Sequence, residues 1–407
     1  MAVEKFVVIG AGHSGGRAVE AMRNAGFSGD IVLIGAEPHL PYERPPLSKE
    51  VLQAKTDYEF PFIRPHQYYD EQDIELRLGV AAASIDPANK NVTLKDGSNL
   101  SYDKLLLTTG GRVQSLSIPG ADLDGVHYLR TLDDARAIET SLREGVRMVV
   151  VGGGFIGLEV AASARQRGCS VTVLELADRL MGRGVPALVS KYFLNLHHDH
   201  GVEIRLSTGI ERVEGNSSVS GVTTDKNDRL EAETVVIGVG IVPETDLAKC
   251  AGLTVDNGII VDEFCRTSAP DVFAAGDATR HKNTFVKGPV RLEAWQCAQN
   301  MAIAAAKIMC GDETPYSEVP WMWSDQFDTN LQVAGVPDNW NDLVVRGDPA
   351  VGSFIGFILD QERLSGAIAV NQPRDMRLTR RMMQAGKLFS ANELADEAIT
   401  LRELSKR

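Results

Sequence analysis

Cysteine is scarce in this sequence, and its placement excludes two common kinds of site. The five cysteines among the 407 residues are Cys169, Cys250, Cys265, Cys297 and Cys310. No two of them form a CxxC or CxxxxC motif, which argues against a structural zinc site and against a redox-active dithiol. Scattered single cysteines are typical of a reducing compartment. We therefore expect a cytoplasmic protein that holds no metal ion.

Long apolar runs and an excess of positive charge are also missing. No apolar stretch reaches the roughly 18 residues that would indicate a membrane span. The first residues, MAVEKFVVIGAG, lead directly into a short strand pattern, so we expect no signal peptide. Lysine and arginine number 42 against 55 aspartates and glutamates, which gives a net charge of −13. This balance argues against a general role on nucleic acid or on an anionic membrane.

Glycine, in contrast, is plentiful, and its first cluster has the spacing G-x-G-x-x-G. This cluster follows the apolar run FVVI, precedes a helical pattern, and consists of Gly10, Gly12 and Gly15. In such a turn the first glycine permits the bend, the second lets a pyrophosphate approach the backbone, and the third allows close helix–strand packing. Glu37 ends the next strand pattern, 37 − 10 = 27 residues after Gly10, where a carboxylate can accept hydrogen bonds from ribose. A lone match occurs by chance in glycine-rich turns, but the complete strand–turn–helix–strand–acid order favours a dinucleotide site; we expect His13 to be a bystander.

The same arrangement recurs later in the chain. Its three glycines are Gly152, Gly154 and Gly157. Glu175 closes the following strand pattern, 175 − 152 = 23 residues on, and an acid there accepts from the ribose 2′-hydroxyl and repels a 2′-phosphate. This favours NAD over NADP. Arg179 and Arg183 follow closely and leave the degree of that preference open, since they could contact the pyrophosphate or lie in solvent.

Two such units predict an α/β fold with two Rossmann-like dinucleotide-binding domains. From about Pro320 the pattern changes to short strands separated by turns, typical of an antiparallel meander, followed by a helix from about Arg374. This last part lacks a glycine-rich phosphate motif, and we interpret it as a C-terminal α+β domain.

Further motifs resemble those of FAD-dependent, glutathione-reductase-type NADH:ferredoxin reductases, the putidaredoxin reductase and aromatic-ring dioxygenase reductase component family. In chain order they are GAGHSGG, YERPPLSK, LLLTTGG, GGGFIGLE, AAGDAT, RLEAWQCA and PWMWSDQF. The resemblance spans essentially the whole chain. It implies a discontinuous FAD-binding domain at 1–112 and 244–319, an NAD-binding domain at 113–243 and a C-terminal domain at 320–407.

The resemblance also implies the site residues. Tightly bound FAD is expected to contact Gly10, Gly12, Ser14, Gly15, Glu37, Arg44, Lys49, Thr109, Gly110, Arg130, Asp277, Glu293, Trp295, Gln296 and Trp323. Asp277 could alternatively serve as a helix N-cap. Trp295 and Trp323 could alternatively belong to ordinary core packing. NADH is expected to contact Gly152, Gly154, Ile156, Gly157, Glu159, Glu175 and Gly240. Lys49, paired with Glu159, is the expected catalytic cation, although an exposed lysine and a helix-surface glutamate remain the alternative.

Electron counting suggests what the flavin does. A nicotinamide gives two electrons as a hydride, whereas a [2Fe-2S] ferredoxin takes one, so a flavin is needed between them. Residues 1–168 contain no cysteine, which argues against a thiol relay and for an external electron acceptor. The expected function is reduction of a [2Fe-2S] ferredoxin that feeds a cytochrome P450 or a ring-hydroxylating oxygenase. The alternatives are a rubredoxin reductase, an NADH oxidase, or an NADH-sensing flavoprotein of the apoptosis-inducing-factor type.

A basic helix provides a candidate docking surface for an acidic ferredoxin. Arg374, Arg377 and Arg381 are spaced by three and four residues and should share one helix face, with Trp323 as a further candidate contact. A solvated helix face without a partner is the alternative. We expect a monomer or a homodimer, without nucleic-acid or membrane partners.

Overall fold

The structure is a computed structural model that describes residues 3–55 and 60–406. The chain forms two compact units, each built from three separate stretches of sequence. The first unit comprises residues 1–44, 60–112 and 242–321, and the second comprises 45–59, 113–241 and 322–407. The first unit is close to the expected FAD-binding domain, but residues 45–59 belong to the second. The expected division into three domains stays a prediction.

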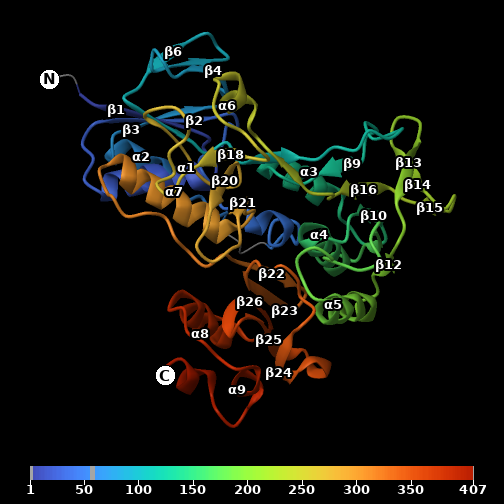
Figure 1. Ribbon diagram of the computed structural model, residues 1–407. Helices are drawn as coiled ribbons and strands as arrows, with labels where there is room; N and C mark the ends of the chain where they lie inside the picture. Colours follow the sequence, from blue (N-terminus) through green and yellow to red (C-terminus); the bar gives the residue numbers. More distant parts are fainter. Residues whose placement is uncertain (1–2, 56–59, 407) are drawn as a thin grey trace. The chain divides into compact units, whose positions relative to one another are not determined.

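The first unit is organised around a five-stranded parallel sheet (Figure 1). Its strands, in spatial order, are β19 (Val272–Ala274), β7 (Lys104–Leu107), β1 (Lys5–Ile9), β2 (Asp30–Gly35) and β3 (Ile74–Leu78). Apart from the edge strand β3, which alternates apolar and charged residues, the strands are nearly continuous runs of apolar residues, as expected where both faces of a parallel sheet are covered. The helices of this unit are α1 (His13–Asn24), α2 (His66–Glu71), α6 (Asp246–Cys250) and α7 (Trp295–Met309). Helices α1 and α7 pack against each other, and α7 also contacts β7 and β19.

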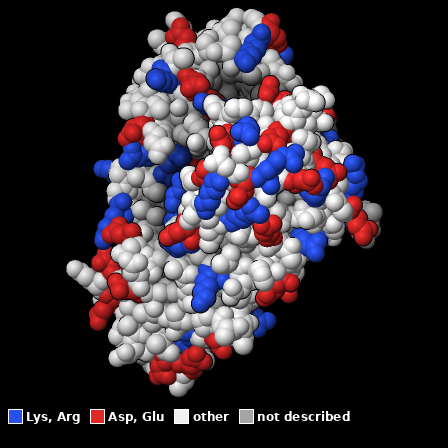
Figure 2. Space-filling view, turned by 90° about the vertical axis from the view of Figure 1, so that its right-hand side faces the viewer, with Lys and Arg blue, Asp and Glu red and all other residues white. Residues whose placement is uncertain are grey.

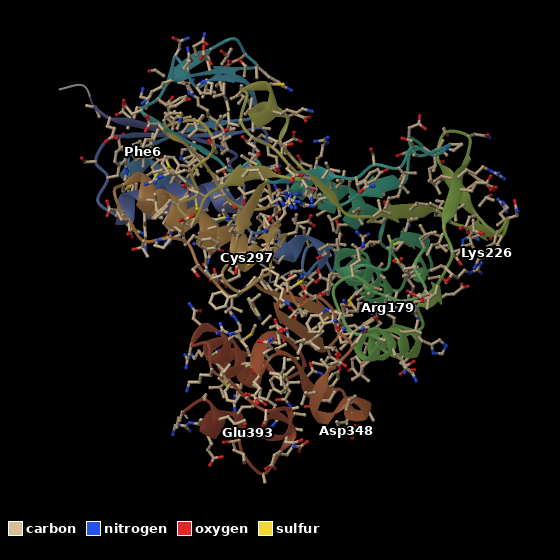
Figure 3. The ribbon with its side chains drawn as sticks, viewed as in Figure 1. Phe6, Arg179, Lys226, Cys297, Asp348 and Glu393 are labelled. Atoms are coloured by element: carbon tan, nitrogen blue, oxygen red, sulfur yellow. The ribbon has the colours of Figure 1, made fainter. Side chains whose placement is uncertain are left out.

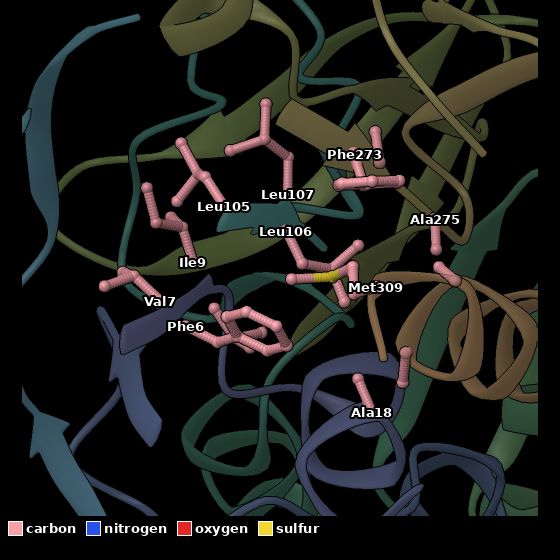
Figure 4. Close-up of a cluster of buried hydrophobic side chains, with 14 of the residues drawn as sticks. Phe6, Val7, Ile9, Ala18, Leu105, Leu106, Leu107, Phe273, Ala275 and Met309 are labelled. Atoms are coloured by element: carbon pink, nitrogen blue, oxygen red, sulfur yellow. The ribbon is translucent and has the colours of Figure 1, made fainter. Parts of the chain in front are cut away.

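The core of the first unit lies between this sheet and its helices. Figure 4 shows Phe6 from β1, Leu106 from β7, Phe273 from β19 and Met309 from α7 in one apolar cluster. Phe6 and Leu106 are almost completely buried, and burial of side chains of this size contributes about 1.5–3 kcal/mol each. This core fixes the carboxyl ends of β1 and β2, from which the first glycine turn and Glu37 extend.

Two small sheets complete the first unit. One is antiparallel and contains β4 (Ala82–Asp86), β5 (Asn91–Leu94) and β6 (Asn99–Ser101). The other contains β18 (Ile259–Val261), β20 (Thr279–Lys282) and β21 (Pro289–Val290). Strands β8 (Gly111–Val113) and β17 (Ile241–Pro243) lie where the sequence passes between the units.

The second unit contains another parallel sheet of five strands. In spatial order they are β12 (Glu203–Arg205), β11 (Ser170–Leu174), β10 (Arg147–Val151), β16 (Thr234–Ile237) and β9 (Val126–Tyr128). Its helices are α3 (Leu132–Ser141), α4 (Phe155–Gln166) and α5 (Ala187–Asp199), with the 3-10 helix η1 (Pro45–Ser48) packed on α3 and α4. A small antiparallel sheet contains β13 (Ile210–Gly215), β14 (Val219–Thr224) and β15 (Arg229–Glu231). The predicted second strand–turn–helix–strand unit is therefore present.

The C-terminal part of the second unit is an antiparallel sheet with short helices. Its strands, in spatial order, are β22 (Trp321–Gln326), β23 (Thr329–Gly335), β26 (Arg363–Val370), β25 (Ser353–Asp360) and β24 (Val344–Asp348). The expectation of a simple meander is wrong at one point, because β23 pairs with β26 and not with β24. The helices are η2 (Pro349–Val351), α8 (Pro373–Gln384), α9 (Ala391–Ala395) and α10 (Leu401–Leu404). Among the described residues, no helix has the length and apolar character needed to cross a membrane.

Candidate functional site

The first glycine turn has the geometry of a phosphate cradle. Gly10 has a φ of +112°, and a β-carbon there would clash with the Thr108 carbonyl oxygen; one at Gly15 would clash with the Gly10 carbonyl oxygen. At Gly12, in contrast, a β-carbon would meet only the Arg44 guanidinium, at 3.7 Å. Gly12 is the N-cap of α1 and supplies no side-chain acceptor, so the first N–H groups of the helix are available to an anion. Gly10 and Gly15 are therefore required by the close packing of the backbone, whereas Gly12 leaves room for a ligand.

An acid and a cation lie together beyond this turn. The Arg44 Nη2 donates to Glu37 Oε1 at 2.9 Å, and the Tyr42 hydroxyl donates to Glu37 Oε2 at 2.6 Å. The Arg44 guanidinium also lies over the Tyr42 ring, 5.3 Å from its centroid. The structure thus brings together Glu37 and Arg44, two of the residues expected at the FAD site, and adds Tyr42, which the sequence analysis missed. This is the donor and acceptor set that the ribose and phosphates of FAD require, so the first glycine turn and its surroundings fit that cofactor.

His13, expected to be a bystander, is buried beside the same turn. Its ring stacks on Trp295 with the centroids 4.8 Å apart, and neither ring nitrogen has a hydrogen-bond partner among the described residues. Burial lowers the pKa of His13 to about 3, and the positive charges of Arg17 and Arg44 add to this effect. His13 is therefore neutral at physiological pH.

The remaining first-unit candidates lie in α1, after β7 and β19, and around the start of α7. The Thr109 hydroxyl donates to the Glu244 carbonyl at 2.6 Å, and the Ser14 hydroxyl donates to the Ala298 carbonyl at 3.3 Å, which joins α1 to α7. Asp277 lies in a turn that leads into strand β20, so the alternative role of helix N-cap is wrong for it. Their expected contacts with FAD, together with those of Gly110, Glu293 and Gln296, stay predictions. Glu293 pairs with Arg291, and Gln296 Nε2 donates to Asn300 Oδ1 at 2.9 Å.

The second glycine turn repeats the geometry of the first. Gly152 has a φ of +111°, and β-carbons at Gly152 and Gly157 would clash with the carbonyl oxygens of Gly238 and Gly152. A β-carbon at Gly154 would meet nothing within 4 Å, and this residue is the N-cap of α4 without a side-chain cap. Ile156, on the first turn of the helix, is 50% exposed. The second turn therefore also fits a dinucleotide pyrophosphate.

Glu175 lies directly at this second turn. Its carboxylate accepts from the Gly153 N–H at 2.6 Å and from the Ala177 N–H at 2.7 Å, which holds it at the end of β11. Arg179, labelled in Figure 3, does not lie in solvent: its guanidinium donates to the carbonyls of Gly182 and Val185. The Arg179 guanidinium is thus occupied by carbonyls of its own loop, whereas the Glu175 carboxylate lies at the glycine turn. A carboxylate in this position favours a ribose without a 2′-phosphate. Leu176, another residue that the sequence analysis missed, exposes 73% of its surface beside Glu175.

Helix α4 also contributes a buried ion pair. The Lys49 Nζ is 2.9 Å from Glu159 Oε2, with side-chain exposures of 13% and 3%. The Ser48 hydroxyl donates to the same oxygen at 2.5 Å, and the Ser324 hydroxyl donates to Glu159 Oε1 at 2.7 Å. The predicted pairing is present, and the exposed-surface alternative for these two residues is wrong. Neither serine was identified from the sequence.

Three other second-unit candidates have separate local contacts. The backbone N–H of Arg130 donates to Asp134 just before the N-cap of α3, and Trp323 Nε1 donates to Asp325 Oδ2 at 3.1 Å. Gly240 has a φ of +112°, and a β-carbon there would meet nothing within 4 Å. Their cofactor contacts stay predictions.

The basic residues of α8 form an exposed row. Met376, Thr379, Met382 and Met383 are the buried residues of this helix. Arg374, Arg377 and Arg381 are exposed, as the spacing predicts, and form no ion pair within the described part of the chain. On the molecular face drawn in Figure 2, basic side chains are mixed with acidic ones, and many surface cations elsewhere do have carboxylate partners. The three arginines are therefore cations available to an acidic partner.

Comparison with known protein families identifies the family of this chain. A family model described as pyridine nucleotide-disulphide oxidoreductase matches residues 4–302, and one described as reductase C-terminal matches residues 321–405. The chain belongs to the pyridine nucleotide-disulphide oxidoreductase family. Its fold class, two Rossmann-like domains followed by a C-terminal α+β domain, is confirmed, as is the resemblance to the ferredoxin reductases of this family.

Individual members of the family are similar over almost the whole chain. The ferredoxin–NAD(+) reductase component of an anthranilate 1,2-dioxygenase system from Burkholderia cepacia is 44% identical over 99% of both chains. Rhodocoxin reductase from Rhodococcus erythropolis is 42% identical over 98% of this chain and 93% of its own. The putidaredoxin reductase of a covalent complex with putidaredoxin has a TM-score of 0.96 at 34% identity, covering 99% of this chain and 98% of that chain.

Proposed function

We propose that this protein is an NADH-dependent flavoprotein reductase that passes electrons from NADH through FAD to a [2Fe-2S] ferredoxin. The observation that carries the proposal is the pair of glycine turns whose middle glycines, Gly12 and Gly154, both leave their helix N-terminus open. Two dinucleotide cradles in one chain suit a resident flavin and a visiting nicotinamide. The relatives named ferredoxin reductases support the same assignment.

The chemistry requires a converter between two-electron and one-electron carriers, and bound FAD supplies it. The overall reaction is NADH plus two oxidised ferredoxins giving NAD⁺, two reduced ferredoxins and one proton. Residues 1–168 contain no cysteine that could take the electrons instead. We expect the reduced ferredoxin to supply a cytochrome P450 or a ring-hydroxylating oxygenase, as the named systems of the relatives suggest, and the protein to work in the cytoplasm.

Each unit contributes a defined part to this reaction. The first glycine turn, Glu37 and Arg44 would hold the FAD diphosphate and ribose. The second glycine turn would bind NADH, with Glu175 accepting from the ribose and disfavouring a 2′-phosphate. Lys49, held by Glu159, would provide the positive charge that stabilises reduced flavin, a role that rests on the family resemblance.

The arginine row of α8 would guide the acceptor. Ferredoxins are acidic, and three exposed cations that pair with no carboxylate in the described part of the chain attract such a protein despite the net charge of −13. We propose Arg374, Arg377 and Arg381 as docking residues, with Trp323 as a further contact.

A comparison of electron acceptors tests this function. The purified FAD-loaded protein is supplied with NADH and, in parallel, with a [2Fe-2S] ferredoxin, a rubredoxin or oxygen alone. Ferredoxin should be reduced much faster than the other two. Preference for rubredoxin or oxygen would contradict the proposal, and slow reduction of all three would favour the sensing flavoprotein.

A further inference from the structure

A chain of buried hydrogen bonds extends from Glu159 to a histidine on another helix. Ser324 and Gln326 are two residues apart on β22 and therefore project from the same face of the strand. Gln326 Nε2 donates to the Ser324 Oγ at 3.1 Å, and Gln326 Oε1 lies 2.9 Å from Nε2 of His197, near the end of α5. Ser324, Gln326 and His197 are fully buried, so no water shell can substitute for these bonds.

The chemistry of the partners sets the direction of every bond. An ionised carboxylate only accepts, so the single Ser324 proton goes to Glu159 Oε1. The Ser324 oxygen can then only accept, which turns the Gln326 amide nitrogen toward it. The Gln326 oxygen consequently faces His197, whose Nε2 must carry a proton. All three donors point toward the carboxylate.

The surroundings of His197 favour the neutral ring that this chain needs. Burial lowers its pKa to about 4; the Gln326 bond opposes this and the charge of His200 adds to it. Its ring forms a T-shaped pair with that of Phe327, with the centroids 5.1 Å apart, and its Nδ1 has no hydrogen-bond partner within the described residues. The structural role of the neutral His197 ring is therefore to donate its Nε2 proton to Gln326 and hold that side chain in place.

Both oxygens of Glu159 are therefore fixed from different directions. Ser48 and Lys49 hold Oε2, while Ser324 holds Oε1. Lys49 is the charged group that contacts this carboxylate, and the two serines are neutral. Without the Ser324 hydrogen bond to Oε1, the carboxylate would be freer to rotate about its Cγ–Cδ bond.

We propose that Ser324, Gln326 and His197 are positioning residues that keep the Glu159 carboxylate oriented, and thereby fix Lys49 for hydride transfer. The catalytic consequence rests on the proposed function. The effect on the orientation of Glu159 itself does not depend on electron transfer. Removing the Ser324 donor leaves Oε1 of this buried carboxylate without the hydrogen bond that orients it.

The test uses the FAD-loaded holoprotein and two readouts. Infrared spectra follow the carboxylate stretching bands of Glu159, which are identified by their loss in Glu159→Gln and shift when a hydrogen bond to the carboxylate is lost. Rapid mixing with NADH, without ferredoxin, gives the rate of flavin reduction. The variants are Ser324→Ala, His197→Leu and His197→Gln; the last retains a donor near the position of Nε2. His200→Leu is the control, since His200 also stacks on Phe327 but is not bonded to Gln326.

We expect the carboxylate bands of Glu159 to shift in Ser324→Ala, and flavin reduction to slow about tenfold near neutral pH, which corresponds to the loss of a hydrogen bond to a charged group. His197→Leu should change both readouts in the same direction, whereas His197→Gln and His200→Leu should match the unmodified protein. Unchanged carboxylate bands and an unchanged rate in Ser324→Ala and His197→Leu would overturn the proposal. If Ser324→Ala does not fold, the two His197 variants still decide. If NADH never reduces the flavin, the proposed function alone is refuted, because the infrared bands of Glu159 are measured without NADH.

Discussion

The Lys49 ammonium lies 2.9 Å from the Glu159 carboxylate, in a position where solvent reaches little of either group. A buried ion pair is costly to break, because the remaining charge is left without a partner. The pair therefore joins the segment after η1 to helix α4.

Lys49→Ala should slow flavin reduction by NADH more than it weakens FAD binding. The variant removes the cation proposed to stabilise reduced flavin, and it leaves Glu159 unpaired at a cost of about 3–5 kcal/mol in stability. Rapid-mixing absorbance measures the first effect, and the free energy of unfolding measures the second. Lys55→Ala is the matched control, since Lys55 is an exposed lysine in the same segment. Normal flavin reduction in Lys49→Ala would mean that its proposed role is wrong.

The two kinds of glycine in the second turn should respond differently to alanine. Gly154→Ala has free space for its methyl group, so the protein should fold normally but bind NADH at least tenfold more weakly, because the methyl occupies the pyrophosphate position. Gly157→Ala would clash with the Gly152 carbonyl and should lower the melting temperature. Thermal melts and NADH titrations distinguish the two. Equal effects of both substitutions on NADH binding and stability would argue against the ligand role of Gly154.

Glu175→Arg should weaken NADH use and improve NADPH use. The substitution removes the ribose acceptor and supplies a cation for the 2′-phosphate. The ratio of kcat/KM for the two nucleotides is the measurement, and Glu175→Gln, which removes only the charge, should lie between the variant and the unmodified protein. An unchanged ratio in Glu175→Arg would show that this side chain does not contact the ribose.

Arg377→Glu should raise the KM for ferredoxin about tenfold at low ionic strength. The difference should shrink as salt screens the charges, while NADH-driven flavin reduction should remain normal. Arg402→Glu makes the same charge change on α10, at another exposed position, and should have little effect. Equal effects of the two variants on KM would indicate a general charge effect without a docking site on α8.

Buried neutral histidines should make the protein sensitive to acid. Burial lowers the pKa of His281 to about 4, and neither of its ring nitrogens has a hydrogen-bond partner among the described residues. An unfolded histidine titrates near 6.5, so below that pH the unfolded chain takes up a proton that the folded protein refuses. Stability should fall by about 2 kcal/mol between pH 7 and pH 5 from this group alone. His281→Leu should reduce that fall, as measured by denaturant unfolding at both pH values, and an unchanged pH dependence would contradict the assignment.

Features that are set by residues close together in the sequence could be predicted from local patterns. Both glycine turns and the exposed arginine face of α8 follow from short spacings, because a turn or a helix face is set within a few residues. The resemblance to a family added the pairing of Lys49 with Glu159, which are 110 residues apart in the sequence.

Contacts between distant segments explain what could not be predicted. Ser324 reaches Glu159 across 165 residues, and no periodicity indicates such a contact. The pairing of β23 with β26 likewise depends on how the sheet packs and not on strand composition. Arg179 resembled a free cation because the sequence does not reveal that nearby loop carbonyls occupy its guanidinium.

Stopped-flow reoxidation of the NADH-reduced flavin tests the central proposal most directly. The reduced protein is mixed with a [2Fe-2S] ferredoxin in one experiment and with oxygenated buffer in another. We expect ferredoxin to reoxidise the flavin far faster than oxygen does, with two ferredoxins reduced for each NADH consumed. A long-lived reduced flavin that ferredoxin does not reoxidise would contradict this account.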